Sequence, residues 1–184
     1  MLVTILGPDG TGKTTLATKL AEEVNSISYV YFGGSNESRK YRFFEAFIKS
    51  DLSNIFLRIF RKILRVINDF DVYSQSKKQH IISDRCPIDN YIITKIQGRK
   101  IRHYYYFILL ISPSPDFVIL LNGDAEIIYK RKEELSVSEI QKYVQYYQDY
   151  LNDKRIKYCT IDTVKNNIEK CLIIAKSELN SRLS

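Results

Sequence analysis

The beginning of the chain carries the pattern that most constrains its fold. An apolar run at residues 2–6 (LVTIL) leads directly into the glycine-rich stretch 7–15 (GPDGTGKTT), and a helical pattern starts at Lys13. A short apolar run of this kind is typical of a strand buried in a parallel sheet. The spacing of the glycines and of Lys13 fits a loop whose backbone N–H groups bind phosphates at the start of a helix. The sequence therefore predicts an α/β protein with a nucleotide site.

Strand and helix patterns alternate along the rest of the chain. Further strands are predicted at 27–32, 80–83, 116–121 and 156–161. Helices are predicted at 13–24, at 38–68 (one helix, or two broken near residue 50), at 87–96, at 124–133, from Ser136 or Ser138 to Leu151, and at 163–179. This alternation predicts a three-layer α/β/α P-loop NTPase fold with a five-stranded parallel sheet and helices on both faces.

The length and the cysteines favour one domain in a reducing compartment. The chain has 184 residues, of which 45% are hydrophobic and 27% charged, which suits a single domain over residues 1–184. Its 3 cysteines are widely spaced and suggest neither a disulfide framework nor a zinc site. The N-terminus lacks the pattern of a signal peptide, and no apolar run has the length of a membrane span. We therefore expect a cytoplasmic protein.

The net charge of +7 favours an anionic partner. A phosphorylated small molecule is the partner that we expect, and a nucleic acid is not expected, because the tyrosines that resemble stacking residues have the spacing of a packed helix face. Four basic residues share one face of the helix predicted at 38–68, namely Arg58, Arg61, Lys62 and Arg65. Such a face is compatible with contact to a membrane surface, but a solvated basic face is the favoured interpretation.

The phosphate loop gives each of its residues a chemical role. The glycines let the backbone approach the phosphates, Lys13 is predicted to reach the β- and γ-phosphates, and the hydroxyl of Thr14 is predicted to bind Mg²⁺. The predicted nucleotide-binding residues are Gly7, Asp9, Gly10, Thr11, Gly12, Lys13, Thr14 and Thr15. The guanine-reading sequence N-K-x-D is missing, since the comparable stretch 122–125 reads NGDA. ATP and Mg²⁺ are therefore the expected cofactors, and phosphoryl transfer to a small molecule is favoured over a switch GTPase.

A second candidate pair, Asp84 and Arg85, follows the strand predicted at 80–83. A carboxylate there can hold Mg²⁺ through water, across from Thr14. The guanidinium of Arg85 suits a second phosphate, because it binds phosphate with two parallel hydrogen bonds. The alternative interpretation is a surface Asp–Arg pair that begins a helix. Taken with the phosphate loop, the pair is predicted to hold the metal and the acceptor.

The chain resembles the thymidylate kinase family of P-loop nucleoside monophosphate kinases. The matching pieces are GPDGTGKTT, ISDR and DFVILLNGDAEIIYKRKEELS, and the closest resemblance is to the thymidylate kinase-like proteins often found beside surface-glycan genes. The resemblance implies transfer of the γ-phosphoryl group of ATP to a nucleoside monophosphate, with dTMP as the default acceptor. It also implies an acceptor region at about 33–100, a lid at about 130–138, and a homodimer formed by a helix after the second or third strand.

The same resemblance assigns roles to Asp9 and to a basic residue of the lid. The acid at the third position of the loop would point away from ATP and accept a hydrogen bond from a sugar hydroxyl of the acceptor; capping of loop amides is the alternative. Family members with glycine at the position of Gly10 supply a catalytic arginine from the lid. The candidates are Lys130, Arg131 and Lys132, and Arg131 is our choice, although a basic helix end also complements the helix dipole.

The chain departs from the family after the second predicted strand. Thymidylate kinases carry an arginine or a basic–acidic–Pro–Gly run there, whereas this chain reads FGGS at 32–35. Residues with alternative roles in an acceptor site or in the core are Arg39, Arg42, Phe43, Phe44 and Phe47. Three rival functions therefore stay open. They are a kinase for a nucleoside or a glycan-pathway sugar or sugar phosphate, a non-catalytic ATP-binding protein, and a nucleic-acid- or membrane-associated protein that uses the net charge of +7.

Overall fold

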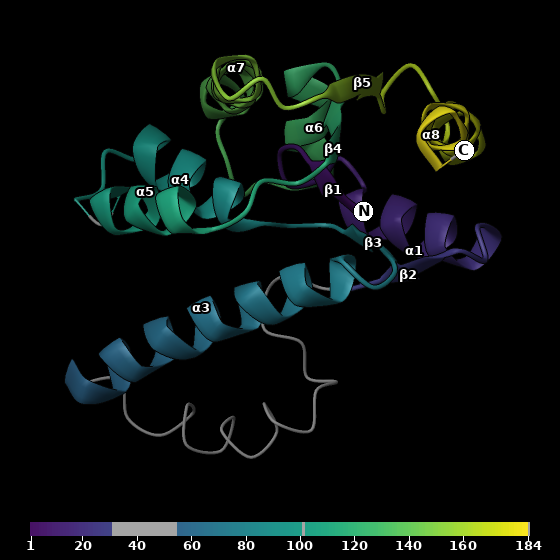
Figure 1. Ribbon diagram of the computed structural model, residues 1–184. Coiled ribbons are helices and arrows are strands. Elements are labelled where there is room, and N and C mark those ends of the chain that lie inside the picture. The colour runs from purple at the N-terminus through teal and green to yellow at the C-terminus, as the bar shows by residue number, and fades with distance from the viewer. Residues whose placement is uncertain (31–54, 101, 184) are drawn as a thin grey trace.

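Five parallel strands form the sheet that organises the molecule (Figure 1). The computed structural model describes residues 1–30, 55–100 and 102–183, and the predictions for residues 31–54 lie outside this part. The strands are β1 (Leu2–Leu6), β2 (Ile27–Tyr29), β3 (His80–Ser83), β4 (Phe117–Asn122) and β5 (Tyr158–Asp162), in the spatial order β2-β3-β1-β4-β5. The predicted five-stranded parallel sheet is confirmed.

The order of the strands puts the phosphate loop at the middle of the sheet. β1 pairs with β3 on one side, with Thr4 opposite Ser83, and with β4 on the other side, with Leu6 opposite Leu120. The strand order reverses at β1, and ligands of such sheets bind at this point beyond the carboxyl ends of the strands. The loop after β1 and the residues after β3 therefore meet at one edge.

Helices cover both faces of the sheet (Figure 1). On one face, α1 (Lys13–Glu23) and α8 (Ile168–Leu183) share a buried core with the strands, formed by residues such as Leu16, Leu20 and Leu172. On the other face, α4 (Pro87–Ile96), α6 (Ala125–Arg131) and α7 (Val137–Asp153) form a second core around Leu6 and Tyr147. This arrangement confirms the three-layer α/β/α fold.

The long helix α3 (Ile55–Ser76) packs on the β3 side of the sheet, where Val72 and Tyr73 are buried against Leu2 and Ile81. The predicted end of this helix at residue 68 is wrong. The last turns continue to Ser76 because their inner residues complete this small core, and because the N-terminal amine of the chain donates to the carbonyl oxygen of Ser76 at 2.8 Å. The basic face predicted for this helix falls on side chains outside the described ones.

Other boundaries also differ from the prediction by a few residues. α8 begins at Ile168 and not at residue 163, because the side chain of Asp162 accepts hydrogen bonds from the N–H groups of Val164 and Lys165, both at 2.9 Å. These bonds hold residues 163–167 as a turn. β2 ends at Tyr29, short of the predicted residue 32.

The helix α5 (Arg102–Ile111) was missed, since only a basic loop at 98–102 was predicted in this part of the chain. It packs beside α4 at the periphery, and of its side chains only Ile108 is buried. Nearly all residues of this segment are aromatic or aliphatic, and only one of them is buried, so polar and apolar residues do not alternate with the period of a helix. This explains why the helix was not predicted. Among the described residues, no helix combines the length and the apolar character needed to cross a bilayer.

Candidate nucleotide-binding site

The phosphate loop between β1 and α1 depends on glycine for its shape. Gly7 and Gly10 have φ angles of 146° and 89°, in the region that L side chains rarely adopt. A Cβ atom on Gly7 would lie 2.5 Å from the carbonyl oxygen of Leu121, and one on Gly10 would lie 3.2 Å from the carbonyl oxygen of Ile128. The loop is therefore pressed against the end of β4 and against α6, and a side chain at either glycine would push it away.

Lys13 lies at the centre of this loop. Its side chain is largely buried, and its ammonium group donates to the carbonyl oxygens of Gly7 at 2.8 Å and Pro8 at 2.9 Å. It also contacts the carboxylate of Asp9 at 3.2 Å. α1 begins here without a side-chain cap, so its first N–H groups face the loop. The lysine and the helix N-terminus thus place positive charge where a polyphosphate is predicted to bind.

Thr14 and Asp84 meet across the sheet edge, as the sequence predicted for a metal pair. The hydroxyl of Thr14 donates to Oδ2 of Asp84 at 2.5 Å. Asp84 is only 1% exposed, and its other oxygen, Oδ1, is buried without a hydrogen-bond partner among the described residues. A buried carboxylate oxygen left in this state is costly unless a ligand or water satisfies it. Mg²⁺ prefers oxygen ligands of this kind, so the residues present fit this metal.

No described group of three or more His, Cys, Asp or Glu side chains could hold a metal ion by itself. A magnesium ion at Thr14 and Asp84 would therefore rely on phosphate and water oxygens for its remaining ligands, which is the usual manner for this ion.

Asp9 lies between two cations. Its Oδ1 atom is 3.2 Å from the Lys13 ammonium and 3.5 Å from the guanidinium of Arg85. Burial alone would raise the pKa of Asp9. The positive charges of Lys13, Arg85 and Lys132 outweigh this effect, so the pKa lies below its ordinary value. The acid in the phosphate loop is therefore held as a carboxylate by its neighbours. Arg85 and Asp9 lie side by side, and their role toward an acceptor stays a prediction.

Asp89 and Tyr147 support this side of the site, and the sequence analysis missed them. One oxygen of Asp89 accepts from the N–H of Cys86 at 2.8 Å in the capping box of α4, and the other accepts from the hydroxyl of Tyr147. Burial raises the pKa of Asp89, and the nearby charge of Lys13 offsets this only in part. The sequence does contain a signal for Asp89. Proline is frequent at the first position of a helix, so Pro87 indicates that residue 86 caps the helix, and an acid three residues after the cap completes a capping box.

These bonds connect two elements of the site. Asp89 lies in the first turn of α4, a helix that begins two residues after Arg85. Tyr147 is fully buried and lies on α7, which follows the predicted lid. A second tyrosine, Tyr143, shares a hydrogen bond with Tyr147. The start of α4, and with it the backbone at Arg85, is thus fixed to α7.

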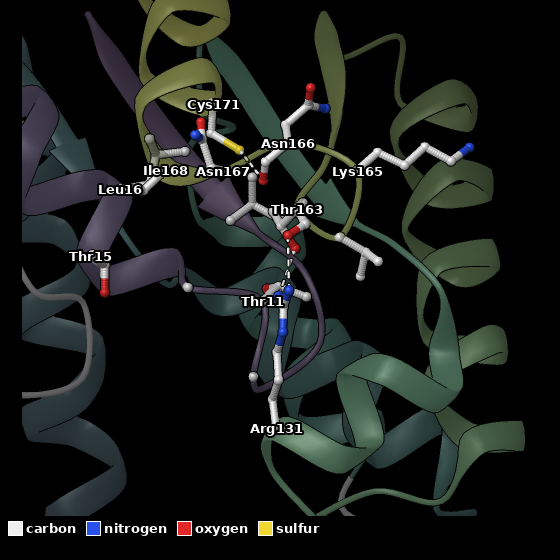
Figure 2. Close-up of a pocket in the computed structure, with 14 residues that line it drawn as sticks. Thr11, Thr15, Leu16, Arg131, Thr163, Lys165, Asn166, Asn167, Ile168 and Cys171 are labelled. Atoms are coloured by element: carbon white, nitrogen blue, oxygen red, sulfur yellow. Dashed lines mark hydrogen bonds between the residues drawn. The ribbon is translucent and has the colours of Figure 1, made fainter.

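A cavity of about 590 Å³ opens on the other side of the phosphate loop. It lies between the loop, the start of α1, the end of α6 and the turn after β5 (Figure 2). Its lining residues are Gly10, Thr11, Gly12, Thr15, Leu16, Leu121, Arg131, Thr163, Val164, Lys165, Asn166, Asn167, Ile168 and Cys171. Those from 163 to 168 were predicted as the start of a helix, so their part in a pocket could not be foreseen.

The basic residues of the lid point in different directions. Figure 2 shows Arg131 extending from α6 toward Thr163, and its guanidinium donates to the carbonyl oxygen of Thr163 at 3.1 Å. Lys132 instead pairs with Glu134 at 3.1 Å and contributes to the lowered pKa of Asp9. The predicted role of Arg131 at the transferred phosphoryl group stays a prediction.

Comparison with known proteins identifies the family. Residues 3–119, more than half of the chain, match the model of the ATPase family associated with various cellular activities (AAA). The chain belongs to this family of P-loop ATPases. The matched range includes the phosphate loop, Asp84 and Arg85. No curated protein has a significant sequence match to the chain.

Solved structures with a similar fold include thymidylate kinases and a deoxyadenosine kinase. A thymidylate kinase from Candida albicans has a TM-score of 0.70 at 18% identity, over 98% of this chain and 91% of that one. A deoxyadenosine kinase from M. mycoides, with dCMP and dCDP bound, has a TM-score of 0.64 at 16% identity, over 98% and 100%. A thymidylate kinase from Ehrlichia chaffeensis has a TM-score of 0.63 at 20% identity, over 98% of both chains. The predicted thymidylate kinase-like fold is confirmed.

Proposed function

We propose that the protein transfers the γ-phosphoryl group of ATP to a nucleoside monophosphate, with dTMP as the default acceptor. The observation that carries this proposal is the pair of sites that meet at Asp9. On one side lie the phosphate loop and a cavity of about 590 Å³. On the other side Arg85 contacts the carboxylate of Asp9 at 3.5 Å. A donor and an acceptor bound on these two sides would meet beside Lys13.

The cavity and the loop suit the donor. Its volume falls within the range of small-molecule sites, and the side chains around it offer both apolar surface and hydrogen-bonding groups. The N–H groups at the start of α1 bind the phosphates, and Lys13 neutralises charge on them. To do so, the ammonium group exchanges its bonds to the carbonyl oxygens of Gly7 and Pro8 for bonds to phosphate oxygens.

The hydroxyl of Thr14 and the carboxylate of Asp84 would hold Mg²⁺. When bound, the metal supplies positive charge to the β- and γ-phosphates. The unpartnered Oδ1 atom of Asp84 supports this assignment, because a hydrated cation would satisfy it.

Arg85 and Asp9 suit the acceptor. The guanidinium of Arg85 is half exposed, so it can bind a phosphate with two hydrogen bonds. Asp9 is ionised and accepts a hydrogen bond from a sugar hydroxyl. Arg131 is proposed to stabilise the charge of the transition state. Little base catalysis is required, since the acceptor phosphate is already a nucleophile.

One similarity favours a second candidate function. The fold is shared with a deoxyadenosine kinase, whose name describes action on a nucleoside and not on a nucleotide. A nucleoside kinase needs no phosphate-binding arginine in its acceptor site. The role of Arg85 therefore separates the two candidates.

The proposal is tested by measuring ADP release from ATP and Mg²⁺ against a panel of acceptors. The panel contains dTMP, UMP, CMP, AMP, GMP, their nucleosides and several sugar phosphates, and the Lys13→Ala variant is the blank. Strong stimulation by one monophosphate supports the proposal and identifies the acceptor. Stimulation only by a nucleoside supports the second candidate, and hydrolysis that no acceptor stimulates contradicts both.

A further inference from the structure

The helix α5 presents an exposed apolar stripe that the proposed reaction does not use. Tyr106, Phe107, Leu110 and Ile111 are 43%, 57%, 60% and 42% exposed. They recur at the spacing of one helix face, whereas Ile108 on the opposite side is buried. Single exposed apolar residues are ordinary, but a contiguous group of them marks an interaction surface.

The segment that carries this stripe has charge of one sign only. Between Asp89 and Asp116 the sequence contains no acidic residue, while it contains Lys95, Arg99, Lys100 and Arg102. The last three lie at or just before the start of α5 and are exposed. Hydrogen bonds from the N–H of Arg99 to Thr94 at 2.9 Å and from the N–H of Arg102 to Arg99 at 3.1 Å fold this loop against the helices. The basic cluster and the apolar stripe therefore adjoin one another.

We propose that α5 and the basic loop before it dock onto the surface of an anionic membrane. In this arrangement Phe107, Leu110 and Ile111 enter the boundary between headgroups and acyl chains, and Tyr106 lies at headgroup depth, where tyrosine is enriched. The basic residues at the start of the helix contact anionic headgroups.

Asp149 and Asp153 of α7 lie near Tyr106 and Lys95, on the side of α5 that faces α7. The exposed apolar side chains and the basic cluster at Arg99, Lys100 and Arg102, which has no acidic residue in its own segment, are the reason for choosing a lipid surface.

Two other occupants fit the stripe less well. A second copy in a twofold dimer would bring the same acid-free, basic segment to both sides of the contact. The stripe also exposes on the order of a few hundred Å², below the roughly 800 Å² per partner of a standard interface. A nucleic acid would use the positive charge, but it gains nothing from exposed leucine and isoleucine side chains.

The location of α5 leaves the nucleotide site free. The helix lies beside α4, at the end of the molecule away from α8 (Figure 1). None of its residues lines the cavity at the phosphate loop. Docking through this face therefore holds the protein at a membrane while ATP still reaches its site.

The test is co-sedimentation of the full-length protein with vesicles, at low and at high salt. Vesicles of phosphatidylcholine alone are compared with vesicles that also contain phosphatidylserine. We expect binding to the anionic vesicles that weakens with salt, and much weaker binding to the neutral ones. Absence of binding to the anionic vesicles at low salt overturns the proposal.

Two variants and their matched controls locate the contact. Phe107→Ser with Leu110→Ser is expected to weaken binding at least roughly tenfold, and Ile173→Ser, at a 67% exposed position on α8, is the control. Loss of one basic residue near an anionic membrane weakens binding roughly fivefold. The double variant Lys100→Glu with Arg102→Glu is expected to lose more than this for each residue, because it also adds negative charge. Lys157→Glu, at an exposed position, is its control. All four positions of the docking variants are exposed, so the fold should survive, as circular dichroism verifies.

Two results would count against the lipid surface. If Lys157→Glu weakens binding as much per substitution as Lys100→Glu with Arg102→Glu does, the attraction is a property of the net charge and not of α5. If sedimentation velocity shows a dimer that the Phe107→Ser and Leu110→Ser substitutions dissociate, a second copy of the chain covers the stripe.

Discussion

Substitution of Arg85 by alanine tests directly whether this side chain binds the phosphate of the acceptor. The guanidinium lies 3.5 Å from Asp9 in the free protein and is half exposed, so this ion pair is worth at most about 1 kcal/mol. Two charge-assisted hydrogen bonds to an acceptor phosphate contribute about 1.5–3 kcal/mol each. After the loss of the Asp9 contact and screening by water are discounted, we expect Arg85→Ala to cost about 2–4 kcal/mol of acceptor recognition.

In kinetic terms this cost lowers kcat/KM for the monophosphate by roughly thirty- to a thousandfold. The assay is steady-state ADP release with the acceptor varied at saturating ATP. Arg85→Lys should recover part of the loss, because lysine keeps the charge but cannot bind bidentately. The KM for ATP should change little and serves as the internal control. An unchanged kcat/KM for a monophosphate in Arg85→Ala would refute the assignment of Arg85 to the acceptor phosphate.

Three further predictions concern the metal, the support of α4 and the loop acid. Asp84→Asn should raise the Mg²⁺ concentration for half-maximal activity by roughly tenfold or more, and a value equal to that of the wild type would remove Asp84 from the metal site. Tyr147→Phe should lower the free energy of unfolding by about 2 kcal/mol in urea titrations, because it leaves a buried oxygen of Asp89 without its donor; Tyr129→Phe is the control, and equal losses would contradict the reasoning. The pKa of Asp9 is lowered from 3.8, so its stabilising contribution is present above that pH and is lost as the pH falls through the lowered value. Asp9→Asn should therefore be less stable than the wild type at pH 7, and the difference should vanish in strong acid; a difference independent of pH would disprove the linkage.

The sequence predicted the sheet well because its inner strands β3, β1 and β4 are buried on both faces. A central parallel strand must be apolar along its whole length, and β1 and β4 satisfy this with side chains that are all buried except Asn122. The phosphate loop could be predicted equally well, because its backbone adopts positive φ angles that glycine tolerates and other residues rarely adopt. These are local constraints, so they leave a local pattern.

The predictions failed where long-range contacts decide the structure. The last turns of α3 depend on a core shared with Leu2 and Ile81. The turn at 163–167 is different, because its signal is local: the side chain of Asp162 accepts from the N–H groups two and three residues later, and the prediction overlooked this signal. The hydrogen bond from Tyr147 to Asp89 joins residues 58 positions apart. No spacing rule in the sequence connects such pairs, although each partner follows an ordinary helix pattern.

The acid in the phosphate loop takes its meaning from this geometry. One oxygen of Asp9 is shared by Lys13 of the phosphate loop and by Arg85, which follows β3. If the proposed donor phosphate draws Lys13 away, the carboxylate would lose one cation, and the proposed acceptor phosphate at Arg85 would remove the other. Because the two cations share one carboxylate in the free protein, we expect a phosphate that binds at either cation to change the electrostatic environment of the other. On the proposed function, Asp9 would hold these two neighbouring cations together until the two phosphates bind.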